Sequence, residues 1–309
     1  VCCLSSLNIE KYEEWKDDKN FIPDVMRFLD NVLTDFIEKA PEEFSDATYS
    51  AMKERSVGLG VMGLHSFFQQ KMIPLESVMS KVWNKKIFEH IQKDVDKTSK
   101  DLAEERGACP DAADYGIKER FSNKTAIAPT ASISIICGGT SPGVEPIAAN
   151  SFTHKTLSGS FNVRNRYLEK ILEKHNKNDD ETWSSITTNQ GSVSHLDFLT
   201  QQEKDVFKTA FELDQKWIVE LGADRTPHIS QAQSINIFVP ADIHKKELHQ
   251  IHFQAWKKGL KSLYYCRSKS IQRAENVNDA KLTDVTANVY KSKNQQNEEQ
   301  EYEECLSCQ

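Results

Sequence analysis

Several features that would place this chain in a special class are missing from it. No apolar run approaches the roughly 20 residues that a membrane-spanning helix needs, and the first residues lack the basic, apolar and small-residue order of a signal peptide. Basic residues are not in excess, since 39 Lys and Arg stand against 46 Asp and Glu, whereas proteins that bind duplex nucleic acid present basic faces. We therefore expect a cytoplasmic protein that binds neither a membrane nor nucleic acid.

Other absences concern the cysteines and the ends of the chain. The seven cysteines are odd in number and scattered, which is unlike the framework of a small secreted domain, so free thiols are expected. The chain has no internal repeat and no GxxxxGK[ST] phosphate-binding loop. It also begins without Met and in mid-pattern, at "VCCLSSLNI", so we expect it to continue something upstream.

What is present is an alternation of helices and strands in a chain with 38% hydrophobic residues. Apolar residues at helical spacing predict helices over residues 23–39, 77–106, 201–221 and 242–259. Thr200 and Glu203 form a capping box at the start of the third helix, and Gly222 would end it. Short apolar runs predict strands over 1–9, from 56, from 123 and over 234–238. This alternation favours an α/β fold with largely parallel strands.

The composition changes after residue 268, and residues 269–309 are predicted to be a flexible, disordered acidic tail. Cys305 and Cys308 form a CxxC within its last five residues. They could be half of a zinc site, but no second ligand pair with zinc spacing lies nearby. A dithiol on a flexible tether, able to attack a disulfide elsewhere, is the interpretation we favour.

Three further segments each allow an ordinary and a functional interpretation. "APTASIS" (128–134) is either a small-residue turn or an anion site, since Thr130, Ala131 and Ser132 would offer N–H groups and hydroxyls at a helix start. Cys2 and Cys3 are adjacent in a strand, so at most one of them faces a given cavity. "LKSLYY" (260–265) ordinarily predicts a strand with one tyrosine in the core and the other at the surface.

Taken together and in this order, the segments resemble the C-terminal half of the large (α) subunit of class I ribonucleoside-diphosphate reductase. The likeness runs from Val1 to about Cys266 and resumes at the terminal dithiol. It is carried by "VCCLSSLN", "SVGLGVMGL" (56–64), "IAPTASIS…GVEP" (127–146), "KTLSGSFNV" (155–163), "AQSINIF" (232–238) and "KGLKSLYY" (258–265). The resemblance implies that residues 1–268 form the C-terminal half of a ten-stranded α/β barrel, followed by the tail.

The resemblance also implies roles for the cysteines and tyrosines. Cys2, rather than Cys3, would be one of two thiols that are oxidised to a disulfide as the ribose is reduced. Cys305 and Cys308 would reduce that disulfide by exchange. Tyr264 and Tyr265 would relay a radical to the substrate site by stepwise proton-coupled electron transfer.

For the substrate, the resemblance implies that Thr130, Ala131, Ser132 and Ile133 hold the β-phosphate end of a nucleoside diphosphate. No metal or other cofactor is expected on this chain, because the radical would come from a metal-containing small subunit. The other expected partners are the N-terminal half of the large subunit and thioredoxin or glutaredoxin. No role is assigned to Cys3, Cys109, Cys137 or Cys266.

The family's catalytic thiyl cysteine lies upstream of the strand with which this chain begins. We therefore expect a fragment or one piece of a split large subunit, active in ribonucleotide reduction only with the missing half and a small subunit. The alternative is a non-catalytic remnant, or a redox and interaction module that works alone through its CxxC.

Overall fold

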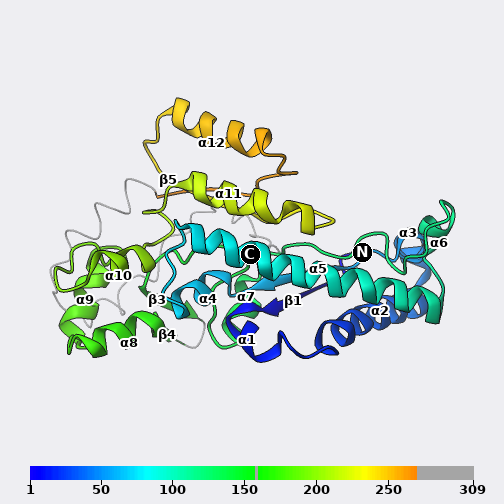
Figure 1. Cartoon of the computed structure of the whole chain (residues 1–309), viewed down its shortest axis with the longest axis horizontal. Helices are drawn as coiled ribbons and strands as arrows, with labels where there is room; N and C mark the ends of the chain where they lie inside the picture. Colours follow the sequence, from blue (N-terminus) through cyan, green and yellow to red (C-terminus); the bar gives the residue numbers. More distant parts are fainter. Residues whose placement is uncertain (157–158, 270–309) are drawn as a thin grey trace, which may run out of the picture.

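The computed structural model describes residues 1–156 and 159–269 as an α/β fold (Figure 1). Residues 270–309, which include Cys305, Cys308 and almost all of the predicted tail, lie outside the described residues. The strands are β1 (Leu4–Asn8), β2 (Gly58–Met62), β3 (Ser151–Thr156), β4 (Gly159–Arg164), β5 (Ile237–Pro240) and β6 (Cys266–Lys269). None of the helices in the described ranges combines the length and apolar character needed to cross a membrane.

In the part of the chain that the structure describes, four helices have more than ten residues: α2 (Phe21–Lys39), α5 (Val78–Arg106), α11 (Gln215–Arg225) and α12 (Lys245–Lys257). The shorter ones are α1 (Tyr12–Trp15), α3 (Ser45–Glu54), α4 (Leu64–Gln70), α6 (Pro110–Ala113), α7 (Ala131–Ile136), α8 (Arg166–Lys174), α9 (Asp180–Thr188) and α10 (Gln201–Val206). The described residues also form three single turns of 3₁₀ helix: η1 (Ile9–Lys11), η2 (Glu42–Phe44) and η3 (Thr226–His228).

Parallel hydrogen bonding joins five segments of the described chain side by side. β1 pairs with β2, with Leu4 opposite Gly58. Bridges then join Leu59 to Thr125 and Ile127 to Gln233, and β5 pairs with β6. The order is therefore β1, β2, residues 124–127, residues 231–240 and residues 264–269, with parallel pairing throughout. This array confirms the predicted α/β fold with parallel strands.

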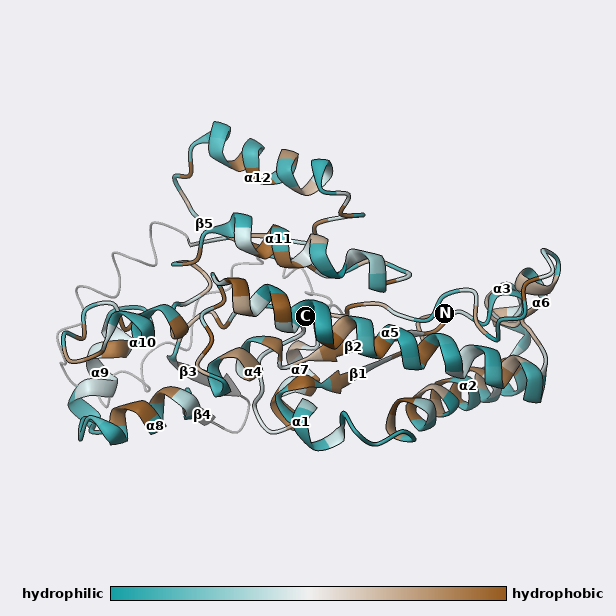
Figure 2. Cartoon of the chain, viewed as in Figure 1, coloured by the Kyte–Doolittle hydropathy of each residue, from teal (hydrophilic) through white to brown (hydrophobic). Residues whose placement is uncertain are grey.

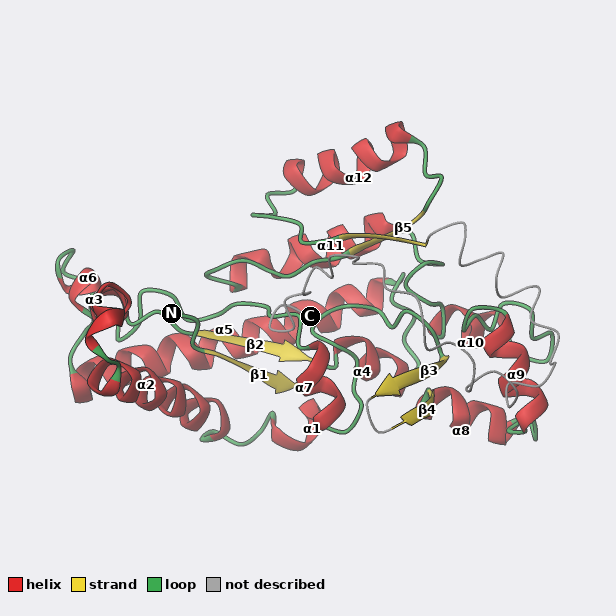
Figure 3. Ribbon diagram, turned by 180° about the vertical axis from the view of Figure 1, so that it is seen from behind, coloured by secondary structure: helices red, strands yellow, loops and turns green. Residues whose placement is uncertain are grey.

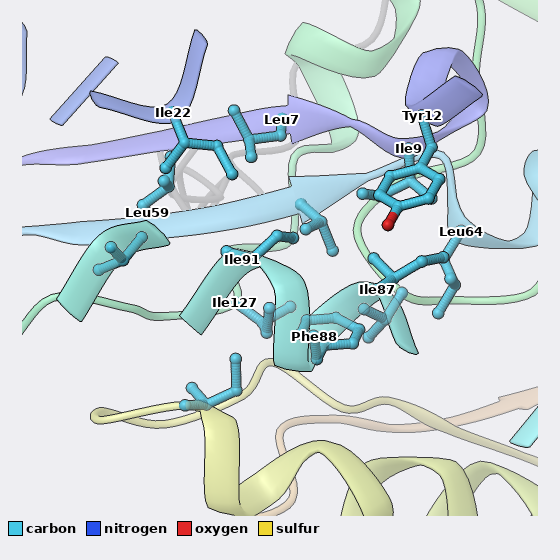
Figure 4. Packing of buried hydrophobic residues seen from close by; sticks show 14 of the residues in the cluster. Leu7, Ile9, Tyr12, Ile22, Leu59, Leu64, Ile87, Phe88, Ile91 and Ile127 are labelled. Atoms are coloured by element: carbon cyan, nitrogen blue, oxygen red, sulfur yellow. The ribbon is translucent and has the colours of Figure 1, made fainter. Parts of the chain in front are cut away.

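The largest core cluster packs helices against the first strands of this array. Figure 4 shows Leu7 of β1, Leu59 of β2 and Ile127 gathered with Ile87 and Phe88 of α5. Apolar residues recur every three or four positions along α5, so one face of the helix is buried while the rest is hydrophilic (Figure 2). Helix packing thus covers one face of the array at β1 and β2.

The helices predicted over 23–39 and 77–106 are confirmed. Pro23 lies in the first turn of α2, where a missing N–H costs no hydrogen bond. The Ser77 side chain caps α5 by accepting from the Ser80 N–H, and the helix ends before Gly107, whose φ is +88°. Such local signals suffice to predict where these helices begin and end, because each acts within one helical turn.

The single helix predicted over 201–221 is wrong, because the chain forms α10 and α11 with residues 207–214 between them. The Gln215 side chain donates to the carbonyls of Ala210 and Leu213, which fixes this connection. Ala210 also donates its N–H to the carbonyl of Ile147, so a distant segment holds the break in place. Gly222 does not end a helix either: it lies inside α11, where a Cβ would come within 2.8 Å of Ile235 Cδ1.

A second group of elements lies at one end of the molecule. The β3–β4 hairpin, α8, α9 and α10 lie together there, away from α2 and α3 at the opposite end (Figure 3). Tyr167, Leu168, Trp183 and Phe207 are among the residues of a separate core cluster in this group.

Candidate functional site at the strand ends

The predicted phosphate loop lies where two parallel strands end. Gly63, directly after β2, donates its N–H to the carbonyl of Ser141 at 2.7 Å. Asn8, the last residue of β1, donates from Nδ2 to the carbonyl of Cys137 at 3.5 Å. Residues 137–143 therefore cover the carboxyl ends of β1 and β2, which is where open α/β sheets bind ligands.

Thr130 connects the central sheet segment to α7 and is held in a strained conformation. It is 8% exposed, and its φ of +55° is rare for a β-branched residue. Its Oγ1 accepts the Gly143 N–H at 2.7 Å, so the start of α7 is tied to the glycine-rich loop. Strain of this kind persists where the surroundings enforce it, as at ligand-binding sites.

The first turn of α7 presents the groups that an anion would need. The N–H groups of Ala131, Ser132 and Ile133 have no acceptor within the helix, because the first turn of a helix leaves them unpaired. Ser132 and Ile133 are exposed. The structure thus brings Thr130, Ala131, Ser132 and Ile133 together around one helix start, as the sequence predicts.

Cys2 and Cys3, just before β1, differ in burial although they are adjacent in the chain. Cys3 is buried against α2, where its thiol lies 3.5 Å from the carbonyl of Leu29, and burial raises the pKa of this thiol. Cys2 is exposed. Of the two thiols, that of Cys2 is the more accessible to other groups.

Tyr264 and Tyr265 lie side by side directly before β6. Their ring centroids are 4.1 Å apart with the planes tilted by 53°, and the two residues are 39% and 47% exposed. The ordinary interpretation, with one ring in the core and the other at the surface, is therefore wrong. The doublet still belongs to the sheet, because Tyr264 donates its N–H to the Ile235 carbonyl and Tyr265 accepts from the Ile237 N–H.

The tyrosine pair lines a cavity, and the Arg267 side chain lies beside it. The cavity, of about 390 Å³, is also lined by His252 and Trp256 of α12. The Arg267 guanidinium carbon lies 5.8 Å from the centre of the Tyr265 ring. The two phenol rings are thus in contact with each other and partly open to solvent.

Two buried polar residues behind the pair were not found from the sequence. Glu145 is 9% exposed and Asn236 is 1% exposed. Asn236 Nδ2 donates to Glu145 Oε1 at 2.6 Å, and Asn236 Oδ1 accepts the Tyr265 N–H at 3.0 Å. Burial raises the pKa of Glu145 to about 7, although the bond from Asn236 and the charge of Arg267 act to lower it. The only available signal was their place in "GVEP" and "AQSINIF", since nothing in the sequence pairs residues 91 positions apart.

The remaining cysteines in the described residues form no disulfide. Within the described ranges, Cys109 is buried while Cys137 and Cys266 are exposed, and all are free thiols. In that same part of the chain, no group of three or more His, Cys, Asp or Glu residues could hold a metal ion.

Comparison with known proteins identifies the fold. The family described as "Ribonucleotide reductase, barrel domain" matches residues 1–119 and 111–266. The chain belongs to this family. The match spans every segment on which the resemblance was based except the terminal dithiol, and so confirms the predicted family and barrel fold.

Relatives of this barrel domain are reductase large subunits. The ribonucleoside-diphosphate reductase large subunit of Invertebrate iridescent virus 6 is 52% identical over 281 residues, which cover 90% of this chain and 29% of the relative. That of Caenorhabditis elegans is 30% identical, over the whole of this chain and 43% of the relative. The solved alpha subunit of the class Id ribonucleotide reductase of Actinobacillus ureae superposes with a TM-score of 0.81 at 38% identity, covering 89% of this chain and 51% of that one. The chain thus spans about a third to a half of the length of these proteins.

Proposed function

We propose that this barrel domain acts in a class I ribonucleoside-diphosphate reductase, which converts ribonucleoside diphosphates to deoxyribonucleoside diphosphates by radical chemistry. The contact between the Tyr264 and Tyr265 rings carries this proposal. Packing needs only one buried ring at such a position, whereas a relay needs two rings in contact. That the pair occurs in a ribonucleotide reductase barrel domain gives the contact its chemical meaning.

In this proposal the start of α7 holds the substrate's diphosphate. Thr130, Ala131, Ser132 and Ile133 supply N–H groups, hydroxyls and the positive end of the helix dipole to the β-phosphate. The ribose then extends along the face of the sheet that carries Cys2. Two thiols, Cys2 and a partner in the N-terminal half, give two electrons and two protons to the ribose, which loses its hydroxyl as water, and they become a disulfide.

Cys305 and Cys308 reduce that disulfide by thiol exchange and are oxidised in turn. Thioredoxin or glutaredoxin then returns the tail to its dithiol form. Tyr264 and Tyr265 carry the radical inward: at each hop one phenol gives up one electron and one proton, and the phenol behind it is restored. A metal-containing small subunit supplies the initial one-electron oxidant, and this chain binds no metal or other cofactor.

The complex assembles in the cytoplasm from the N-terminal half of the barrel, this chain and the small subunit. A stand-alone CxxC module or a non-catalytic remnant is not favoured, because relatives that match 90% or more of the chain are named as reductase large subunits.

The relay is tested by reconstituting the barrel with its N-terminal half, a small subunit and dithiothreitol, and assaying CDP reduction. Tyr264→Phe and Tyr265→Phe each keep the ring and remove the phenol, so each should abolish turnover while leaving the circular dichroism spectrum unchanged. Tyr115→Phe, at a residue that is 83% exposed, is the matched control and should retain activity. Substantial turnover in either doublet variant refutes the relay.

The tail is tested separately by replacing Cys305 and Cys308 with Ser. The variant should lose thioredoxin-supported turnover but complete a single turnover with the active-site thiols that are already reduced. If multiple turnover with thioredoxin persists, the proposed shuttle is wrong.

A further inference from the structure

Tyr12 lies inside the main core, and its phenol begins a chain of three polar side chains. The residue is 2% exposed, and Figure 4 shows its ring close to Leu64 and Ile87. Tyr12 Oη lies 3.0 Å from Nδ1 of His90, and His90 Nε2 lies 3.2 Å from Oδ2 of Asp94. The His90 and Asp94 side chains are partly exposed. A phenol, an imidazole and a carboxylate thus follow one another from the core towards the surface.

The direction of these two hydrogen bonds follows from the Asp94 carboxylate, which can only accept when it is ionised. In a neutral His90 ring, Nε2 therefore carries the hydrogen and Nδ1 keeps its lone pair. The Tyr12 hydroxyl is then the donor to Nδ1. Burial, together with the charges of Glu13, Asp17 and Asp94, raises the pKa of Tyr12 to about 12. At neutral pH the phenol therefore gives up its proton only when it also loses an electron.

Two oxidisable indole rings surround this phenol, and one of them reaches the candidate site. The ring centroid of Trp15 lies 5.0 Å from that of Tyr12, and that of Trp83 lies 6.5 Å from it. Trp15 Nε1 donates to the carbonyl of Asn8 at 3.0 Å. Asn8 is the last residue of β1 and also contacts the loop of residues 137–143. Ring contacts therefore join Tyr12 to the strand end at which the candidate site lies.

Of these three rings, that of Tyr12 is the one that can pass a proton to a base as it loses an electron. The indole N–H of Trp15 is bonded to a backbone carbonyl, which does not take up protons. The ammonium groups of Lys86 and Lys71 lie 4.7 and 5.5 Å from the centre of the Trp83 ring. Positive charge at this distance opposes the removal of an electron from that ring. An electron vacancy that enters the cluster is therefore most stable on Tyr12.

We propose that Tyr12, with His90 as its base, is a redox site that reduces thiyl radicals and similar one-electron oxidants. Tyr12 gives one electron to the oxidant, which turns a thiyl radical into a thiolate, and its phenol proton passes to His90 Nδ1. The products are a neutral tyrosyl radical and an imidazolium, whose charge the Asp94 carboxylate stabilises. The site protects thiols such as that of Cys2 from stray oxidants. This inference goes beyond the proposed function, in which neither Tyr12 nor His90 takes part.

The proposal requires His90 as a base and not only as a hydrogen-bond acceptor. His90→Gln offers an amide oxygen that can accept the bond from the phenol but cannot take up its proton. His90→Phe keeps a ring and removes both the acceptor and the base. A purely structural role predicts that His90→Gln resembles the unmodified protein, whereas the redox role predicts that it resembles His90→Phe. Circular dichroism checks that both variants fold.

The test places 3-fluorotyrosine at position 12 of the whole chain, co-produced with the N-terminal half of the large subunit. A light flash generates tris(bipyridine)ruthenium(III) in solution as the oxidant, and electron paramagnetic resonance is recorded after rapid freezing. The ¹⁹F hyperfine splitting marks a radical at position 12 and at no other tyrosine. It should appear with His90 in place and fall by about tenfold or more in His90→Gln and His90→Phe, as expected when a general base is lost.

A matched control carries 3-fluorotyrosine at position 115 instead, where the side chain is 83% exposed. Its phenol can release a proton directly to solvent, so its ¹⁹F splitting should be equally strong in all three His90 backgrounds. This control shows that the oxidant is formed in each sample.

Protection is measured separately through the free thiol of Cys2. After repeated flashes, alkylation and mass spectrometry should show a faster loss of this thiol in Tyr12→Phe than in the unmodified protein. Tyr49→Phe, at a residue that is 63% exposed, is the control and should lose the Cys2 thiol at the unmodified rate.

A missing ¹⁹F splitting at position 12 in the unmodified background, beside a clear signal at position 115, overturns the proposal. A splitting in His90→Gln that equals the unmodified one also overturns it, because a hydrogen bond without a base would then suffice. An unchanged loss of the Cys2 thiol in Tyr12→Phe refutes the protective role. Loss of the splitting in both His90 variants, with faster loss of the thiol in Tyr12→Phe, supports the redox site.

Discussion

Asp30 shows how much a single residue can depend on distant partners. It lies in α2, is fully buried and accepts hydrogen bonds from Arg55, Arg106 and Arg120. Burial acts to raise the pKa of this carboxyl, but the bonds from Arg120 and Arg55 outweigh it and hold the pKa below its usual range. Three guanidinium groups are thus gathered around one carboxylate.

Replacing Asp30 with Ala should destabilise the chain severely, by about 3–5 kcal/mol, because it leaves buried guanidinium groups without their counter-charge. Urea denaturation followed by tryptophan fluorescence measures this. Asp101→Asn, which breaks the exposed pair with Lys97 on α5, is the control and should leave the midpoint unchanged. Equal midpoints for Asp30→Ala and the unmodified chain would contradict the burial argument.

Glu145 should make stability depend on pH in the opposite sense to an ordinary carboxylate. Its pKa is about 7 in the fold against an ordinary value of 4.5, so the folded chain keeps a proton that the unfolded chain releases. Stability should therefore fall as pH rises from 4.5 to 7, by on the order of 3 kcal/mol in total. Glu145→Gln has no carboxyl group to titrate and should not lose this stability. The urea midpoint of Glu145→Gln, relative to that of the unmodified chain, should therefore rise between pH 5 and pH 8. Parallel pH profiles for the two proteins would rule the shift out.

At the scale of elements, β2 depends on a glycine that lets two backbones touch. A Cβ at Gly60 would lie 2.2 Å from the carbonyl oxygen of Ala126, the neighbouring segment of the sheet. The glycine-rich pattern of "SVGLGVMGL" is visible in the sequence, but the segment that approaches Gly60 is not. The reason for this glycine is therefore steric and lies between elements.

Gly60→Ala should weaken the sheet more than a glycine replacement that only strains the backbone. Gly259→Ala is the comparison, because its φ is +78° and a Cβ there meets nothing within 4 Å, so it should cost about 1–2 kcal/mol. Thermal unfolding should place Gly60→Ala below Gly259→Ala. The reverse order would show that the sheet yields at this contact.

The capping box of α10 is an element that the sequence did identify. Thr200 Oγ1 accepts the Glu203 N–H, and the Glu203 carboxylate accepts the Thr200 N–H at 2.8 Å. Thr200→Ala removes the side-chain acceptor and should cost about 1 kcal/mol, whereas Thr200→Ser keeps the hydroxyl and should cost little. Chemical denaturation distinguishes them, and identical curves would mean that α10 adds nothing to stability.

At the scale of the whole molecule, the array of parallel strands is open within the described residues. β1 and β6 are its outer members there, and unpaired strand edges readily bind other strands. Apolar side chains are exposed beside the candidate site, among them Leu4 at 48%, Ile135 at 56% and Ile136 at 83%. Exposed strand edges and apolar side chains of this kind favour association with other chain segments.

Residues 1–309 produced alone should therefore self-associate, and co-production with the N-terminal half of the barrel should yield a single one-to-one complex. Size-exclusion chromatography with light scattering measures both states. Ile135→Ser with Ile136→Ser should reduce association of the chain by itself, while Val78→Ser, on a residue that is 73% exposed at the start of α5, should not. A monodisperse monomer of the unmodified chain would contradict this expectation.

The sequence by itself determined what depends on neighbours within a few residues or on a fixed order of segments. Periodicity and caps gave α2, α5 and the start of α10, because each signal acts within one turn. The order of "VCC", "APTAS" and "LYY" indicated the family and hence the barrel. Only the tertiary structure divided α10 from α11, placed both tyrosine rings at the surface in contact, and joined Glu145 to Asn236. These features arise from contacts between residues far apart in the chain, whose free energies outweigh local preference and leave no periodic trace in the sequence.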